Sequence, residues 1–344
     1  MLHRGEAHPD VAQLVARLTG GQEAVGSSPV IRTRQGAQMC TLFLYKIIDF
    51  SCRTRYNRSN KIIFIRKGKP MKIIDAHLHL FKSENGRAEE MANAVGHSNS
   101  VPHLREVYNK LGIVHGVIMG NGGLEIENHS YPSDMFHYCV GLDSTLMADG
   151  KNTISHMAEQ IEEHLKRDLC CGVKLYPGYN KISLTDELYQ PVYDLAAKYN
   201  KPVAVHMGLT SFSRAHLKYC HPLALDEVAA DNPETQFVMC HFGNPFFETS
   251  AAVVLKNPNV YAELSGLLEG RINIDEYMKE QAGYVGALKT WMYAVNNWDK
   301  FMFGTDWPIV NLSEYIEFFK RIVPEKHWDK VFFENANRVY RLGL

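Results

Sequence analysis

The sequence predicts an α/β fold, a (β/α)8 or TIM barrel, as a single catalytic domain over residues 71–344. Three observations predict it: short apolar segments recur as strand candidates, helical patterns lie between them, and the strand candidates number eight over a length typical of such a barrel. The predicted strands cover, in order, residues 72–80, 115–120, 138–143, 171–176, 202–208, 236–243, 260–266 and 301–308.

The segments between the strands read as helices. Residues 152–168 begin at a capping Asn or Thr and carry apolar residues three and four positions apart. Residues 185–202 open with the cap-like Thr185 and stop before Pro202. Residues 267–299 are longer than one connecting helix, and we expect a loop and a helix over the barrel mouth.

Composition bounds the class of protein. With 45% hydrophobic and 22% charged residues, the chain resembles an ordinary soluble globular protein, and it has neither an apolar run of membrane-spanning length nor a signal-like start. Its seven cysteines are odd in number and irregularly spaced, which favours reduced thiols in a cytoplasmic protein. We therefore expect a small-molecule substrate and neither a nucleic-acid nor a membrane partner; a homo-oligomer is compatible with the sequence.

The first seventy residues differ from the rest. Residues 1–70 hold twelve of the 37 Lys and Arg but only four of the 38 Asp and Glu, and they show no sustained periodicity. Residues 1–34 resemble the conceptual translation of a transfer-RNA gene, and residues 66–69 can be encoded almost wholly in purines, as a ribosome-binding site requires. We interpret Met71 as the true start and residues 1–70 as a start-site overrun, with a disordered tail or targeting arm as the alternatives.

Several strand ends carry side chains that can bind metal. His77 and His79 lie two residues apart on the first strand, so they share one face. Chemistry in TIM barrels sits at the carboxyl ends of the strands. The groups at the other predicted ends are Lys174, His206, His241 and Asp306. Nitrogen ligands with a carboxylate suit zinc, iron or manganese better than calcium, so we expect a divalent metal site there.

Together these segments resemble the amidohydrolase superfamily, specifically the amidohydrolase-related group of metal-dependent hydrolases and decarboxylases. The resemblance spans 71–344 and is carried by "DAHLH" at 75–79, by the strand-end histidines, by "GTDWP" at 304–308 and by "ENANRVYRL" at 334–342. It implies that the metal ligands are His77, His79, His206 and Asp306. It also implies that His241 is an acid–base or carbonyl-polarising residue.

Lys174 is ambiguous within that resemblance. In binuclear members of the superfamily a carboxylated lysine bridges two metals, whereas in mononuclear members it does not. We predict one ion, zinc in preference to manganese or iron, with Lys174 holding an anionic group of the substrate. A bridging role for Lys174 is the alternative.

The predicted activity is hydrolysis of an amide, lactone or ester of a small, carboxylate-bearing substrate. Metal-activated water would attack, Asp306 would orient or deprotonate it, and His241 would polarise the carbonyl and protonate the leaving group. Non-oxidative decarboxylation of an aromatic or unsaturated acid is the alternative, and a noncatalytic metal-binding barrel is the third. The residues after strand ends that could bind substrate are Tyr176, Tyr179, Phe212, Arg214, Phe242, Asn244 and Trp307.

Overall fold

The computed structural model describes residues 54–56, 62–64, 71–81, 86–142 and 154–344, and the chain divides into two units, Met1–Arg66 and Lys67–Leu344. In the first unit β1 (Thr54–Tyr56) and β2 (Ile62–Phe64) form an antiparallel pair, where the sequence predicted no strand. The interpretation of residues 1–70 as a start-site overrun falls largely outside the described residues and stays a prediction.

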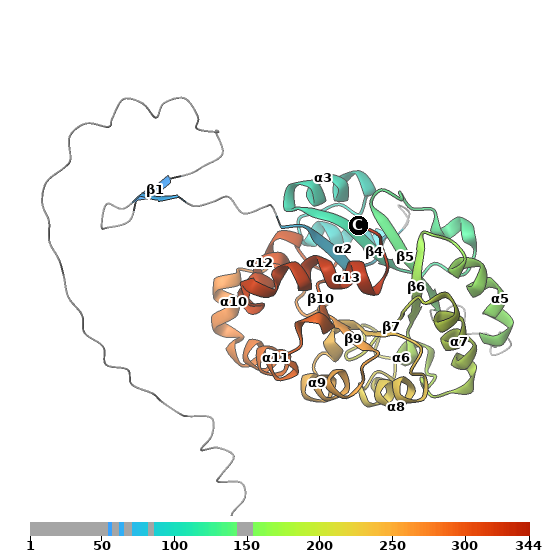
Figure 1. Cartoon of the computed structure of the whole chain (residues 1–344). Helices are drawn as coiled ribbons and strands as arrows, with labels where there is room; N and C mark the ends of the chain where they lie inside the picture. Colours follow the sequence, from blue (N-terminus) through green and yellow to red (C-terminus); the bar gives the residue numbers. More distant parts are fainter. Residues whose placement is uncertain (1–53, 57–61, 65–70, 82–85, 143–153) are drawn as a thin grey trace, which may run out of the picture. The chain divides into compact units, whose positions relative to one another are not determined.

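The second unit is a TIM barrel, which confirms the predicted fold (Figure 1). Eight parallel strands, β3 to β10, follow one another round the sheet in chain order. Each predicted strand is present. Their bounds are β3 Ile73–Leu78, β4 Ile113–Met119, β5 Phe136–Leu142, β6 Cys170–Leu175, β7 Val203–Val205, β8 Phe237–Met239, β9 Val260–Glu263 and β10 Phe301–Met302.

Helices surround the sheet in Figure 1. They are α2 Gly86–Ala94, α3 Val101–Leu111, α5 Ile154–Leu165, α6 Pro177–Asn180, α7 Gln190–Tyr199, α8 Leu223–Asp231, α9 Phe247–Lys256, α10 Ile274–Glu280, α11 Ala282–Val295, α12 Leu312–Ile322 and α13 Asn335–Val339. The expectation for residues 267–299 needs correction: α10 packs against α12, and α11 packs against α9, in the outer ring. Of residues 267–299, Glu269 in the loop before α10 lines the cavity described below.

The barrel closes between its first strand and the segment after its last. The backbone N–H of Ala76 donates to the Phe303 carbonyl (3.0 Å), and that of His79 donates to the Trp307 carbonyl (2.8 Å). The buried Asp75 carboxylate accepts hydrogen bonds from the Thr305 backbone N–H (2.9 Å) and hydroxyl (2.7 Å). This closure brings the two histidines of β3 beside the loop that carries Asp306.

Two apolar layers hold the barrel together. Buried residues between the strands and the helices form the larger layer, to which Leu78 belongs. Inside the barrel a smaller cluster includes Ala76 and Cys139, and Val339 and Tyr340 at the end of α13 belong to it. Side chains of β3 do not alternate strictly, because the pairing register with β4 shifts between Asp75 and Leu78.

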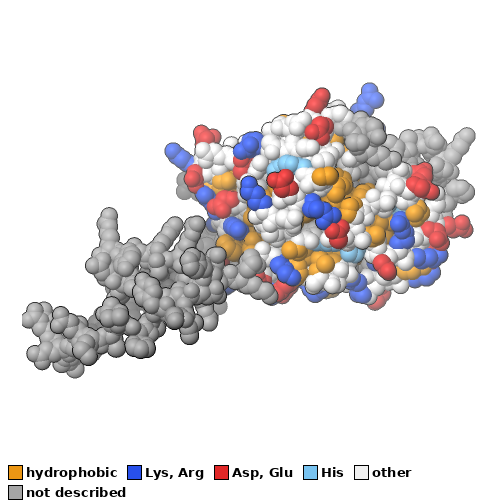
Figure 2. Space-filling model, turned by 90° about the horizontal axis from the view of Figure 1, so that it is seen from above, with side chains coloured by type: hydrophobic (Ala, Val, Ile, Leu, Met, Phe, Trp, Pro, Cys, Tyr) orange, Lys and Arg blue, Asp and Glu red, His pale blue; other side chains and the backbone are white. Residues whose placement is uncertain are grey.

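Two observations concern the described helices and one face of the surface. None of the described helices has the length and apolar character needed to cross a bilayer. On the face shown in Figure 2, basic and acidic side chains are interspersed with apolar ones. Described residues of that face therefore form no single-sign patch of the kind that attracts nucleic acid.

Candidate metal centre and active site

Two histidines and one aspartate meet at the point where the barrel closes. The Nε2 atoms of His77 and His79 are 3.4 Å apart. Asp306 Oδ1 lies 3.2 Å from Nε2 of His77 and 3.4 Å from Nε2 of His79. The structure thus brings together three of the four predicted metal ligands. All three atoms carry lone pairs when both rings are neutral.

The outer nitrogens of both rings are committed to hydrogen bonds. His77 Nδ1 donates to the buried carboxylate of Glu263 (2.7 Å), and His79 Nδ1 donates to the Met119 carbonyl (2.9 Å). In the neutral rings these partners leave both Nε2 atoms as acceptors facing the Asp306 oxygen, an arrangement that either a ring proton or a bound cation can balance. Zinc bonds of about 2.1 Å give tetrahedral edges of about 3.4 Å, so the observed separations fit a divalent ion.

His206 and His241 extend this cluster through a chain of hydrogen bonds. The Ser265 hydroxyl lies 2.9 Å from His241 Nδ1, His241 Nε2 lies 3.1 Å from His206 Nδ1, and His206 Nε2 donates to the Leu209 carbonyl (2.8 Å). His206 Nδ1 is therefore an acceptor, as a metal ligand must be. Ring nitrogens of His77 and His241 and an oxygen of Asp306 also lie within 4.8 Å of one another.

Burial and mutual attraction set the charges of the cluster. Burial disfavours ionisation of Asp306, but the nearby His77 and hydrogen bonds from both β3 histidines hold its pKa well below the usual range. Burial also opposes a charge on His77, yet the Glu263 and Asp306 carboxylates raise its pKa well above the ordinary value. Burial lowers the pKa of His241 to about 4 and that of His206 well below its ordinary value. Positive charge is therefore favoured at His77, whereas burial lowers the pKa of His79 despite its hydrogen bond to Asp306.

The backbone at this site is in an uncommon conformation. His241 and Asp306 have φ values of 60° and 63°, in the left-handed region that side chains with a Cβ adopt rarely. Gly266, with φ of 59°, lies close to both: a Cβ there would come within 2.9 Å of His241 Nδ1 and 3.0 Å of Asp306 Oδ2. Substitution at Gly266 would therefore displace both side chains.

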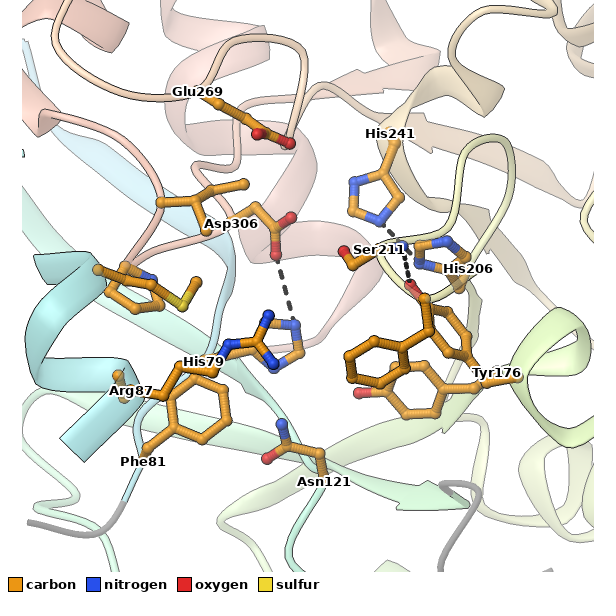
Figure 3. A pocket seen from close by; sticks show the side chains of 16 residues that line it. His79, Phe81, Arg87, Asn121, Tyr176, His206, Ser211, His241, Glu269 and Asp306 are labelled. Atoms are coloured by element: carbon orange, nitrogen blue, oxygen red, sulfur yellow. Dashed lines mark hydrogen bonds and ion pairs between the residues drawn. The ribbon is translucent and has the colours of Figure 1, made fainter. Parts of the chain in front are cut away.

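A cavity of about 540 Å³ opens over these residues (Figure 3). Four of the predicted metal-binding and acid–base residues line it directly, namely His79, His206, His241 and Asp306. Its walls also carry aromatic rings from several strand ends. Phe81 follows β3, Tyr176 and Tyr179 follow β6, and Phe212 follows β7. Such a space suits a flat, partly apolar small molecule.

Other predicted residues lie away from the cavity walls. Lys174 is fully buried, and its Nζ donates to Cys240 Sγ (2.7 Å). Arg214 is exposed, and Trp307 is buried against His97, with ring centroids 5.0 Å apart. Of the proposed substrate-binding residues, the four that do not line the cavity are Arg214, Phe242, Asn244 and Trp307.

Sequence reasoning missed Glu263. This carboxylate is fully buried at the end of β9 and accepts hydrogen bonds from His77 Nδ1, from the His241 backbone N–H (3.1 Å) and from the Ser265 backbone N–H (2.7 Å). The signal was present, because a single acid in the apolar segment "VYAEL" ends the seventh strand of the barrel. The strand-end rule that found the other groups applies equally to it.

The sequence model of a family described as amidohydrolase matches residues 146–342, more than half of the chain. No curated protein matches the sequence.

Solved structures with the same fold are similar over nearly their whole length. An uncharacterized TIM-barrel protein from Bordetella bronchiseptica is 21% identical with a TM-score of 0.60, covering 79% of this chain and 99% of its own. A probable 2-pyrone-4,6-dicarboxylic acid hydrolase from Acinetobacter baumannii, solved with citric acid, is 17% identical with a TM-score of 0.54, over 79% and 100% of the chains. A dihydroxybenzoic acid decarboxylase from Polaromonas, solved with manganese and 2-nitroresorcinol, is 12% identical with a TM-score of 0.57, over 80% and 98%.

Proposed function

Because the chain belongs to the amidohydrolase family, we propose that it is a metal-dependent hydrolase that acts on an amide, lactone or ester of a small, carboxylate-bearing substrate. The observation that carries the proposal is the convergence of two histidine Nε2 atoms and one carboxylate oxygen at 3.2–3.4 Å. The two rings are held by hydrogen bonds to Glu263 and to the Met119 carbonyl. We propose His77, His79, His206 Nδ1 and Asp306 as ligands of one divalent ion, with zinc favoured over manganese and iron.

When bound, a divalent ion supplies a polarising charge and lowers the pKa of a bound water toward about 7. Asp306 stays ionised, so it can accept a hydrogen bond from the attacking water and orient it. If His206 Nδ1 held the ion, the Nε2–H of His241 would be free of that ring and could donate to the carbonyl oxygen of the substrate. Asp306 would take the proton that the water loses on attack; as His241 gives its proton to the leaving group, the proton from Asp306 would replace it, so that the imidazole ends neutral.

Decarboxylation of an aromatic acid is the second candidate. The observation that favours it is the aromatic lining of the cavity, which would hold a flat ring against the acid–base residue. The same His241 would then deliver a proton to the ring carbon as carbon dioxide leaves, so the two candidates differ in the bond that breaks and share the same residues.

The test is a product analysis on protein stripped with a chelator and reloaded separately with zinc, manganese and iron. A panel of aromatic lactones, esters, amides and free carboxylic acids is offered to each form. We expect hydrolysis without carbon dioxide release, lost on stripping and restored by one of the metals. Carbon dioxide release from the free acids would favour the decarboxylase, and inertness of every metal-loaded form would favour a noncatalytic barrel.

A further inference from the structure

The charges that line the cavity are unevenly distributed. Among the described lining residues Arg87 is the one permanent cation, while Glu269 and Asp306 are the acids. The two cations predicted from the sequence to meet an anionic substrate, Lys174 and Arg214, do not line the cavity. A carboxylate in this space would therefore have one guanidinium within the walls to meet it.

Arg87 lies in the first turn of α2, and its guanidinium rests on an aromatic wall. Its Cζ is 5.9 Å from the centroid of the Phe212 ring, and Tyr179 meets the same ring edge-on, with centroids 5.6 Å apart. Stacking on a ring face steadies the guanidinium plane while leaving its edge, where the N–H groups lie, available to a ligand. Arg87, Phe212 and Tyr179 thus form one wall of the cavity.

Arg87 differs from three other surface arginines in having no acidic partner among the described residues. Arg105 pairs with Asp134, Arg271 with Glu314 and Arg321 with Glu317. Within the described part of the chain, Arg87 has neither an ion pair nor a hydrogen bond from its guanidinium. An exposed arginine that is stacked, faces a cavity and has no acidic partner there is suited to bind an anion from outside the chain.

We infer that Arg87 is a specificity-determining residue that binds a carboxylate of the substrate by a bidentate contact, while the reacting group lies at the histidine–aspartate cluster. This inference rests on the proposed function and narrows its substrate to a flat molecule with a carboxylate apart from the bond that breaks. Phe81 and Tyr176, which also line the cavity, provide the apolar surface for the body of that molecule (Figure 3).

The experiment compares two probes that differ by one charge, isophthalate and 3-carbamoylbenzoate, by isothermal titration calorimetry with the metal-loaded protein. We expect the wild-type protein to bind isophthalate about tenfold more tightly or better, since charge-assisted hydrogen bonds discriminate by at least that factor. Arg87→Met should abolish the preference. Arg87→Lys should retain part of it, because lysine keeps the positive charge but lacks the paired N–H groups of the guanidinium. Arg105→Met is the matched control, an exposed arginine away from the cavity, and should change nothing.

A preference that survives in Arg87→Met would overturn the inference, as would a wild-type protein that does not distinguish the two probes. Circular dichroism and metal content of the variant show whether it is folded and loaded. Binding is measured without turnover, so the carboxylate site at Arg87 and the proposed hydrolase activity can be refuted independently. A protein that hydrolyses nothing but still prefers isophthalate through Arg87 would contradict the proposed activity and leave the carboxylate site in place.

Discussion

Replacing Glu263 by glutamine removes the charge that holds His77 in its metal-binding tautomer. The carboxylate accepts the His77 Nδ1–H at 2.7 Å, and both side chains are fully buried, so little solvent screens the contact. Loss of a hydrogen-bond partner behind a ligating histidine typically weakens metal affinity about 10- to 100-fold. For a charged and buried partner we expect the upper end, about 2.8 kcal/mol of binding free energy.

The assay is competition for zinc against a chromogenic chelator at pH 7.5. Glu263→Gln also places an amide where the Ser265 backbone N–H now donates at 2.7 Å, so we expect a separate loss of about 1–3 kcal/mol in unfolding free energy, measured by denaturant titration of the stripped protein. Glu269→Gln is the matched control, because Glu269 lines the same cavity without a hydrogen bond to a described residue. Zinc affinity in Glu263→Gln within threefold of the wild type would refute the reasoning.

Four further predictions test the remaining parts of the site and the fold. His79→Ala should lose the metal, as measured by elemental analysis, because its Nε2 is one of three converging acceptors; full occupancy would show that this ligand is misassigned. His241→Asn should keep one ion but lower kcat by about 10²- to 10⁴-fold, since an amide cannot transfer the proton; a fall from two ions to one would instead make His241 a ligand. Lys174→Met should leave one ion per chain, and a fall from two would reveal a bridging lysine. Burial lowers the pKa of His164 to about 4, so the unfolded chain binds a proton there first as the pH falls below about 6.5. Between about pH 6.5 and 4, the free energy of unfolding of the metal-free protein should therefore fall less steeply in His164→Gln than in the wild type. Equal slopes in the two proteins would contradict this prediction.

The barrel was predictable because its strands are short, apolar and bounded by turns, and the strand-end rule then located His77, His79, His206, His241 and Asp306. That rule places a Cα at the rim of the barrel, but it does not say where a long side chain points. Lys174 satisfies the rule, yet its stem runs inside the barrel and its amine meets Cys240.

Residues after a strand end are harder still to predict. Tyr176 and Tyr179 turn toward the cavity, whereas Arg214 and Trp307 do not, and the difference depends on loop conformation that no periodicity encodes. Arg87 was not predicted, for the same reason. It lies on a helix after the first strand, where sequence spacing gives no reason to favour one charged residue over another. The register shift in β3 is likewise a tertiary effect, invisible in an alternating pattern.

The closure of the barrel has a consequence for how the chain is made. Asp75 and Thr305, whose side chains join the first and last strands, are 230 residues apart, so the ribosome must deliver nearly the whole domain before they can meet. Until then β3 lacks its second neighbour, and Asp306, one of the four proposed ligands, has not been synthesised. Contacts at this separation make folding slow, because the entropy of closing the loop must be overcome before they form. We therefore expect a nascent chain that stops before β10 to remain an open sheet without metal affinity, and release of the final segment to complete fold and site together.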